Sequence, residues 1–441
     1  MGRRRQRKGG AAAGAAGVLW LLVAGSSVAD GQAPADPAAL PAPAAPPAPV
    51  NPTGGIARWL NPATAPFIPI PEIDVDPQSG VTLGVIATFL DVNQHGEIER
   101  ITAPDVFHSQ YFGWGAGLSL YGFPSEDNQW LVLGSVKQHV EHDFDARYLA
   151  GQTRATPLSW SVEAIDDRIG TARFFGIGNE TPDYNESTYV KDQASLAASI
   201  GYNFTQATQL AYSARWRRVD VLPGVLSGIP SIETLYPDVN GVGNEHALEH
   251  SLTFTRDTRD ALNIPHSGAR YLLYAGFASR SLGSSVAYSF VGADARCYFP
   301  FGPDFTLAWH GSVRYMPSAA EAPFWALSSL GGDRSIPNGR EPLRSDGADR
   351  YVDENLIATG AELRMRVAGF GAFSTHVSLE LAPFVDAGKV FSNGPGNLLS
   401  EMHTAAGIGV RGVASPYVVG YVDVGYGRGK AVVFSGINYP F

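Results

Sequence analysis

The chain has 441 residues and a formal net charge of −10, with 17% charged and 11% aromatic residues. Its 50 glycines lie among short alternating segments, which favours one large β structure over several mixed domains. The acidic balance argues against nucleic acid as a partner, and no apolar run reaches the roughly 20 residues of a membrane-spanning helix. Nothing in the sequence calls for a cofactor or a metal.

The first 29 residues have the pattern of a secretory signal. A basic start is followed by a short apolar core and by small residues that end near Ala29. The arginine cluster also allows twin-arginine export, but the apolar core directly behind it fits general secretion better. Cys297 is the only cysteine, so an internal disulfide is excluded and a lipid anchor at a cysteine is not expected. Residues 30–66, rich in Pro and Ala, are expected to form an extended periplasmic linker.

From Gly80 onward most segments alternate between apolar and polar residues. Phe305, Leu307 and Trp309 alternate with Thr306, Ala308 and His310. Alternation alone is also compatible with a soluble sandwich. Segments of about 10 to 14 residues, aromatic residues near their ends and alternating loop lengths favour a barrel with lipid outside and a polar lumen. We therefore predict an all-β, antiparallel transmembrane barrel of about 16 strands over residues 67–441.

The expected strands can be placed so that the long connections share one side. They lie near 80–91, 98–108, 112–123, 129–141, 157–168, 189–203, 207–220, 246–257, 268–280, 284–299, 304–316, 355–367, 376–390, 403–413, 417–427 and 430–441. The long connections 169–188, 221–245, 317–354 and 391–402 then fall outside, and most inner turns are short. Residues 142–156 fit an inner turn least well.

The stretch Leu379–Phe391, "LELAPFVDAGKVF", carries charged residues within an apolar run. Glu380 and Asp386 share one face of the expected strand, and this face points to the lumen if the other faces lipid. The chain stops on Tyr439, Pro440 and Phe441, and an aromatic final residue resembles the signal by which outer-membrane barrels are recognised for assembly. We therefore expect the protein to be a client of the barrel assembly machinery.

Several motifs resemble the C-terminal barrel of the BamA/TamA superfamily, the bacterial surface antigen domain. They are "FVDAG" at 384–388, "GAELRMRV" at 360–367, "LGGDRSIPNGR" at 330–340, "TRDTRDALNIPHSGARY" at 255–271 and "FFGIGNE" at 174–180. The resemblance covers roughly Phe67 to Phe441. It identifies the chain as a short member without POTRA domains, because the segment between the signal and Gly80 is too short for such a module.

The resemblance implies a barrel whose long sixth outer loop folds back into the lumen. There an arginine at the loop tip contacts the wall, including the Asp of the Phe-x-Asp-x-Gly motif. The tip departs from the family pattern, since Pro337 and Asn338 stand near the positions of its Arg and Gly. We expect Arg340 to take the arginine's role, with Arg334 and Arg344 as alternatives. The predicted loop-wall lock comprises Arg340, Asp386, Glu362, Gly388 and Glu380.

The resemblance implies a bacterial outer-membrane protein in contact with lipid, which assists protein insertion or translocation, or moves lipid, at a weak seam between the first and last strands. Its partners would then include unfolded barrel clients or periplasmic proteins. The alternative is a passive pore or a structural surface antigen with a plugged lumen. An enzyme is not expected: "HALEH" at 246–250 lies in a strand that separates its zinc-protease ligands, and "GIGVRG" at 407–412 lacks the helix of a phosphate site.

Overall fold

A computed structural model describes residues 68–92, 98–125, 127–336, 339–372, 375–392, 396, 400–414, 418–437 and 439–441. The predicted signal (1–29), the predicted linker (30–66) and the two loop-tip residues Pro337 and Asn338 lie outside the described residues. None of the described helices is long and apolar enough to cross a membrane.

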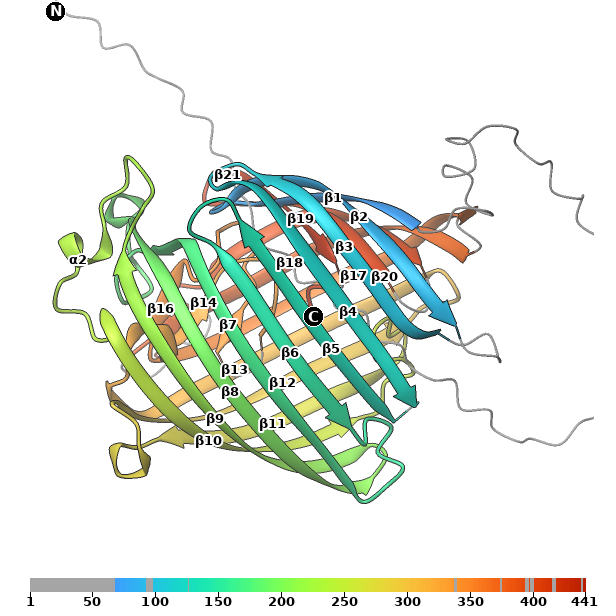
Figure 1. The fold of residues 1–441 in the computed structure, drawn as a ribbon, viewed down its shortest axis with the longest axis horizontal. Helices are drawn as coiled ribbons and strands as arrows, with labels where there is room; N and C mark the ends of the chain where they lie inside the picture. Colours follow the sequence, from blue (N-terminus) through green and yellow to red (C-terminus); the bar gives the residue numbers. More distant parts are fainter. Residues whose placement is uncertain are drawn as a thin grey trace, which may run out of the picture.

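Eighteen strands of the described chain form one antiparallel sheet that curves into a nearly closed barrel (Figure 1). Each strand pairs with the next along the chain, except that β13 pairs with β17 across a long loop. The strands are β1 Ile68–Asp76, β2 Gly80–Val92, β3 Ile98–Ser109, β4 Gly113–Ser125, β5 Asn128–Lys137, β6 His142–Ala150, β7 Leu158–Phe174, β8 Ser187–Thr205, β9 Thr208–Pro223, β10 Gly243–Asp257, β11 Gly268–Ala278, β12 Ala287–Pro300, β13 Phe305–Glu321, β17 Asn355–Ala372, β18 Thr375–Phe391, β19 His403–Ala414, β20 Val418–Gly427 and β21 Lys430–Ile437.

The prediction of about 16 strands was therefore wrong by two, because β1 and β6 were missed. The prolines at 69 and 71 argue against a central strand, and β1 is indeed an edge strand that has a backbone ladder only with β2 in the described sheet. The turn before β6, Gln138–Glu141, lacks the residues that mark turns, and its Val140 takes a φ of 61°, unusual for a β-branched residue. With β1 and β6 added, strands β2 to β5 run opposite to the predicted direction.

The side chains of the wall alternate between an exposed apolar face and a buried polar face. Leu83, Val85 and Val385 are more than half exposed, whereas Asp386 and Arg411 are almost completely buried. A soluble sandwich would bury its apolar face and expose the polar one. The reversed arrangement is that of a barrel in lipid.

The barrel closes between β1 and β21 without a ladder of paired backbone groups among the described residues, although the two strands lie side by side. Among the described residues, the Ser435 side chain joins the two strands by hydrogen bonds. The Ser435 hydroxyl accepts a hydrogen bond from the Val75 amide at 2.7 Å and donates one to the Ile73 carbonyl at 3.0 Å. We call this contact the seam.

The long connections share one end of the barrel, which we call the loop end. It carries the short helices η1 Asp183–Asn185, α2 Ile232–Leu235, η2 Arg280–Leu282 and η3 Phe324–Ala326. An apolar cluster there includes Phe174, Tyr288, Phe290 and Phe324. The long loop, residues 322–354, is the seventh connection at this end rather than the predicted sixth, because β1 and β6 were missed. It contains a small sheet of β14 Ser328–Leu330, β15 Arg340–Glu341 and β16 Tyr351–Asp353.

Candidate functional site

The long loop is anchored against the wall by apolar packing and by glycines that leave room for it. Leu330 and Leu343 are fully buried in a cluster with residues of β17, β18 and β19. A Cβ on Gly388 would lie 2.7 Å from Leu330 Cδ1, and a Cβ on Gly425 would lie 1.6 Å from the carbonyl oxygen of Arg344. At these two positions of the wall, a residue with a side chain would collide with the loop.

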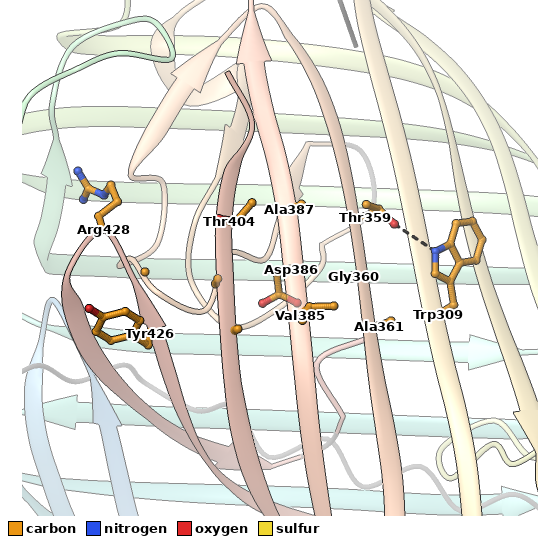
Figure 2. A pocket seen from close by; sticks show the side chains of 13 residues that line it. Trp309, Thr359, Gly360, Ala361, Val385, Asp386, Ala387, Thr404, Tyr426 and Arg428 are labelled. Carbon is orange, nitrogen blue, oxygen red and sulfur yellow. Dashed lines mark hydrogen bonds between the residues drawn. The ribbon is translucent and has the colours of Figure 1, made fainter. Parts of the chain in front are cut away.

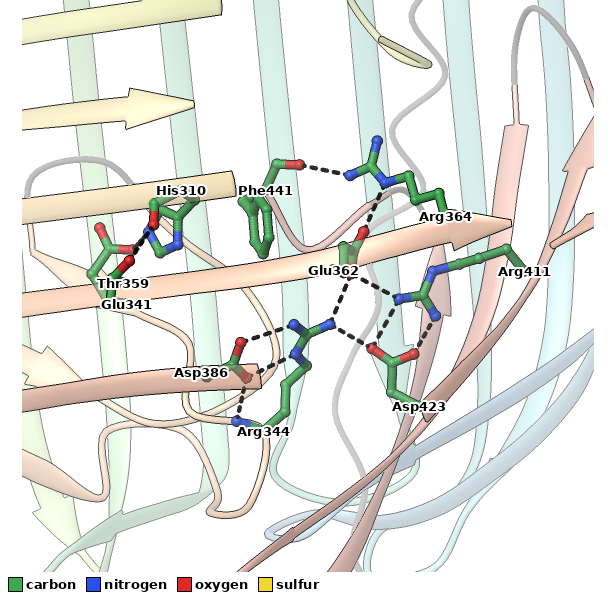
Figure 3. A network of polar contacts seen from close by, with 10 residues as sticks. All are labelled: His310, Glu341, Arg344, Thr359, Glu362, Arg364, Asp386, Arg411, Asp423 and Phe441. Atoms are coloured by element: carbon green, nitrogen blue, oxygen red, sulfur yellow. Dashed lines mark hydrogen bonds and ion pairs between the residues drawn. The ribbon is translucent and has the colours of Figure 1, made fainter. Parts of the chain in front are cut away.

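Arg344 of the long loop forms the centre of a buried ionic network (Figure 3). Its guanidinium donates two hydrogen bonds to Asp386 on β18, from Nε at 2.9 Å and from Nη2 at 2.8 Å. The backbone amide of Arg344 donates a third to the same carboxylate at 3.1 Å. Nη1 reaches Glu362 on β17 at 3.0 Å and Asp423 on β20 at 3.1 Å. One loop side chain thus links three strands with charge-assisted bonds.

Two further arginines complete the network. Arg411 on β19 binds Asp423 and donates to Glu362 at 3.2 Å, and Arg364 donates from Nε to the other oxygen of Glu362 at 2.8 Å. Arg344, Arg364 and Arg411 face Glu362, Asp386 and Asp423, and none of the six is more than 3% exposed. Three positive charges balance three negative ones, which a buried network requires.

The structure joins some of the residues predicted for the lock and separates others. Asp386 and Glu362 both bind Arg344 in the network, and Gly388 leaves room for the Leu330 side chain because it has no Cβ. Arg340 does not reach them, because it binds Asp349 within the same loop. Glu380 lies beyond the network and accepts a hydrogen bond from the Tyr439 hydroxyl at 2.9 Å.

The C-terminal residues do not continue the last strand, as had been predicted for 430–441. Phe441 is 4% exposed, its ring stacks on His310 with centroids 4.9 Å apart, and its backbone oxygen accepts a hydrogen bond from Arg364 at 3.3 Å. The Arg364 guanidinium lies 3.5 Å from the centre of the Tyr439 ring. The proposed assembly-signal residues therefore pack beside the network.

A second loop-wall contact lies beside the first. Glu341 of β15 accepts a hydrogen bond from His310 of β13 at 2.6 Å, and both side chains are 1% exposed. No motif around His310 or Glu341 predicted this pair. The two residues are 31 positions apart, one on a wall strand and the other in an irregular loop, so no local pattern links them.

A polar clasp joins three connections at the loop end. Asp183 accepts hydrogen bonds from Arg350 of the long loop at 2.9 Å and from Arg428 of the β20–β21 turn at 3.1 Å, and it also pairs with Lys430. Partial burial raises the pKa of Asp183, but the hydrogen bonds from Lys430 and Arg350 and the charge of Arg428 outweigh burial. They hold the pKa below its usual value.

The wall is hollowed on its outer surface behind Asp386 (Figure 2). The hollow has a volume of about 600 Å³ and is lined mainly by small residues of β17, β18 and β19, with Trp309 and Tyr426 at its sides. Trp309 Nε1 donates a hydrogen bond to Thr359 Oγ1 at 3.1 Å. The outward-facing lining of the hollow is apolar, so this part of the barrel surface suits contact with lipid.

The network includes residues that the prediction of the lock did not contain. Arg411 and Asp423 belong to it, and Arg344 was only an alternative to Arg340. Arg344 was among the three loop arginines that the resemblance offered for this role. The register counted from Leu330 placed the tip arginine near Pro337, seven residues before Arg344.

Comparisons with known proteins identify the family and agree with the barrel fold. The Omp85 superfamily domain matches residues 111–425. Comparison with curated sequences finds no significant match. BamA from Haemophilus ducreyi lacking POTRA domains 1–3 is similar in structure, with 11% identity, a TM-score of 0.50, and coverage of 80% of this chain and 75% of that one.

Two CdiB structures also align. CdiB from Acinetobacter baumannii has 12% identity and a TM-score of 0.44, and covers 85% of this chain and 65% of that one. CdiB from Escherichia coli has 11% identity and a TM-score of 0.45, and the alignment covers 84% of this chain and 63% of that one. At such identities the likeness to BamA concerns the fold alone, and family membership follows from the domain match. The predicted resemblance is confirmed: the chain belongs to the Omp85 superfamily and is an outer-membrane β-barrel protein.

Proposed function

We propose that this barrel assists the insertion or translocation of outer-membrane proteins, or the transfer of lipid, at the seam between β1 and β21. The observation that carries the proposal is the missing backbone ladder. Seventeen neighbouring strand pairs of the described sheet have one, whereas β1 and β21 are joined through Ser435. A few side-chain bonds cost far less to break than a full ladder.

In this proposal the long loop folds into the lumen and is held there by the Arg344 network while the seam opens. Arg344 binds β17, β18 and β20, so it ties together the strands on one side of the seam. The wall beside β21 would then stay rigid, and movement would be confined to the first strands. A rigid wall with one weak joint fits lateral opening better than a uniformly flexible barrel.

The alternative function is a structural surface barrel with a plugged lumen. The apolar cluster at the loop end favours it over an open pore, because buried Phe174, Tyr288, Phe290 and Phe324 occupy the space between the strands there. This alternative shares the lock and the plug with our proposal. It differs in giving the seam no role.

The experiment that tests the proposal is the folding of an unfolded small barrel client into liposomes, with and without this protein, while dye leakage is recorded from the same vesicles. We expect faster client folding without leakage. Leakage without faster client folding would indicate a pore. If the protein causes neither leakage nor faster folding, the result supports the structural role.

A disulfide across the seam provides the matched control. Val75→Cys and Ser435→Cys, combined with Cys297→Ser, would lock two residues that already touch. Oxidation should abolish the acceleration and reduction should restore it. A second disulfide is the control: Ala198→Cys and Ala214→Cys join register partners in the β8–β9 ladder. Its oxidation should not change the acceleration of client folding.

Phe441 and Tyr439 retain their proposed role as the assembly signal of the unfolded chain. Their contacts with His310 and Arg364 form only after folding. We propose that folding removes these side chains from the assembly machinery. A Phe441→Ala variant should then assemble more slowly in cells, as followed by the appearance of the heat-modifiable folded form.

A further inference from the structure

Asp294, His310 and Glu341 bring three potential metal ligands together from three elements: β12, β13 and the long loop. Each offers one ligand atom, and these atoms all lie within 4.8 Å of one another. The three residues are 2%, 1% and 1% exposed. Clusters of exposed acidic groups are common on protein surfaces, whereas a buried carboxylate is costly without a partner.

An unpaired oxygen in this cluster points to a missing partner. Asp294 Oδ1 accepts a hydrogen bond from Arg296 at 3.1 Å, but Asp294 Oδ2 is buried and has no partner among the described residues. His310 Nε2 lies 2.6 Å from Glu341 Oε2, and the unpaired His310 Nδ1 lies toward Gly360 of β17, 3.5 Å from where a Cβ of that residue would stand. The hydrogen bond between His310 and Glu341 leaves Asp294 Oδ2 unsatisfied.

We propose that Asp294, His310 and Glu341 bind a first-row divalent cation such as Zn²⁺. One imidazole nitrogen and two carboxylate oxygens are ligands that suit Zn²⁺ and its neighbours better than Ca²⁺ or Mg²⁺, which prefer oxygen alone. The bond from Arg296 to the other oxygen of Asp294 would orient this ligand, as partners behind metal ligands commonly do.

The site would give the long loop a second anchor. Glu341 belongs to the loop, whereas Asp294 and His310 belong to the neighbouring wall strands β12 and β13. These strands lie on one side of β17, and Arg344's partners Asp386 and Asp423 lie on the other side. A bound cation would therefore fasten the loop to β12 and β13, and Arg344 fastens it to β17, β18 and β20. This inference does not depend on the seam or on what the barrel handles.

The test is metal binding by the purified full-length protein in detergent, without a histidine tag. The protein is stripped with a chelator and titrated with Zn²⁺, followed by elemental analysis, and with Co²⁺, followed by its visible absorption. We expect one equivalent per chain. Asp294→Asn and Glu341→Gln keep the side-chain shapes, and each should lower the affinity at least about tenfold.

His142→Ala is the matched control, because His142, Asp166 and Asp192 form another His and carboxylate group, at a more exposed position. It should bind as the unmodified protein does. Heat-modifiable gel migration shows that each variant is folded. Absence of stoichiometric binding, binding unchanged in folded Asp294→Asn, or binding lost in His142→Ala would overturn the proposal.

Discussion

At the residue scale, the Arg344 network is stable because its charges balance. A buried charge without a partner costs several kcal/mol, so each member depends on the others. The notable feature is that one loop residue supplies a third of the positive charge. Removing it would leave three carboxylates with two arginines, which pair with Glu362 and Asp423, and Asp386 would lose its ion pair.

We predict that Arg344→Ala destabilises the loop-wall contact by about 3–5 kcal/mol, the usual cost of removing one partner of a buried ion pair. The measurement is the temperature at which heat-modifiable gel migration is lost, together with protease cleavage of the long loop. Asp386→Asn should act in the same direction, because it weakens the two guanidinium bonds.

Arg340→Ala is the control for this prediction. Its pair with Asp349 is about one third exposed, so its loss should cost about 1 kcal/mol or less. If Arg340→Ala destabilised the loop as much as Arg344→Ala, the assignment of the lock to Arg344 would fail.

We also predict that Gly425→Ala displaces the long loop, because the added Cβ would lie 1.6 Å from a backbone oxygen that cannot swing away. The expected cost is about 1–3 kcal/mol, as for overpacked sites. Gly420→Ala on the same strand meets no atom within 4 Å and should be nearly neutral. Protease cleavage of the loop distinguishes the two, and equal cleavage would contradict the prediction.

At the scale of elements, the two ends of the sheet are its weakest part. β1 contains prolines, which cannot donate to a ladder, and β21 is only eight residues long. Each strand therefore has a full ladder on one side and only side-chain contacts on the other. Opening at this joint leaves all the other ladders intact.

We predict that Ser435→Ala opens the seam more often, since it removes both bonds to β1. A loss of about 1 kcal/mol corresponds to about fivefold faster amide hydrogen exchange at Val75 and its neighbours. Ser161→Ala removes the hydroxyl contact with Ser199 between β7 and β8, which share a ladder, and should not accelerate exchange there. Equal effects in the two variants would argue against a weak seam.

At the scale of the whole molecule, the barrel is closed at the loop end by apolar packing and by the Asp183 clasp. The clasp brings together the β7–β8 connection, the long loop and the β20–β21 turn. It therefore connects the strand next to the seam with the loop that carries Arg344.

The pKa of Asp183 is held below its usual value in the folded protein. The stability that Asp183 adds to the clasp is therefore fully present above the pKa of about 4 that it has in the unfolded chain, and it is lost as the pH falls below that value. We predict no change in the clasp between pH 7 and 5, and loosening below about pH 4. The measurement is the difference in loop protease protection between the unmodified protein and Asp183→Asn. This difference should be constant above pH 5 and disappear at low pH; a constant difference at all pH values would refute the linkage.

Much of the fold could be predicted from the sequence, because strand alternation is local. Sixteen of the eighteen strands were located, and Asp386 and Glu362 were assigned to the polar face, since the period of two fixes which side chains share a face. The misses were local exceptions. Val140 takes a turn conformation that its side chain disfavours, and the prolines of β1 are tolerated only because that strand lies at the edge.

The sequence by itself determined the barrel, its outward apolar face, its polar interior and its membership in a superfamily. Only the tertiary structure decided that Arg344 rather than Arg340 meets Asp386, that Phe441 packs on His310, and that Ser435 joins the seam. The physical reason is separation along the chain. Arg344 lies 42 residues from Asp386 and 79 from Asp423, so their pairing depends on the path of the loop and on glycines that give it space, and no local pattern records that path.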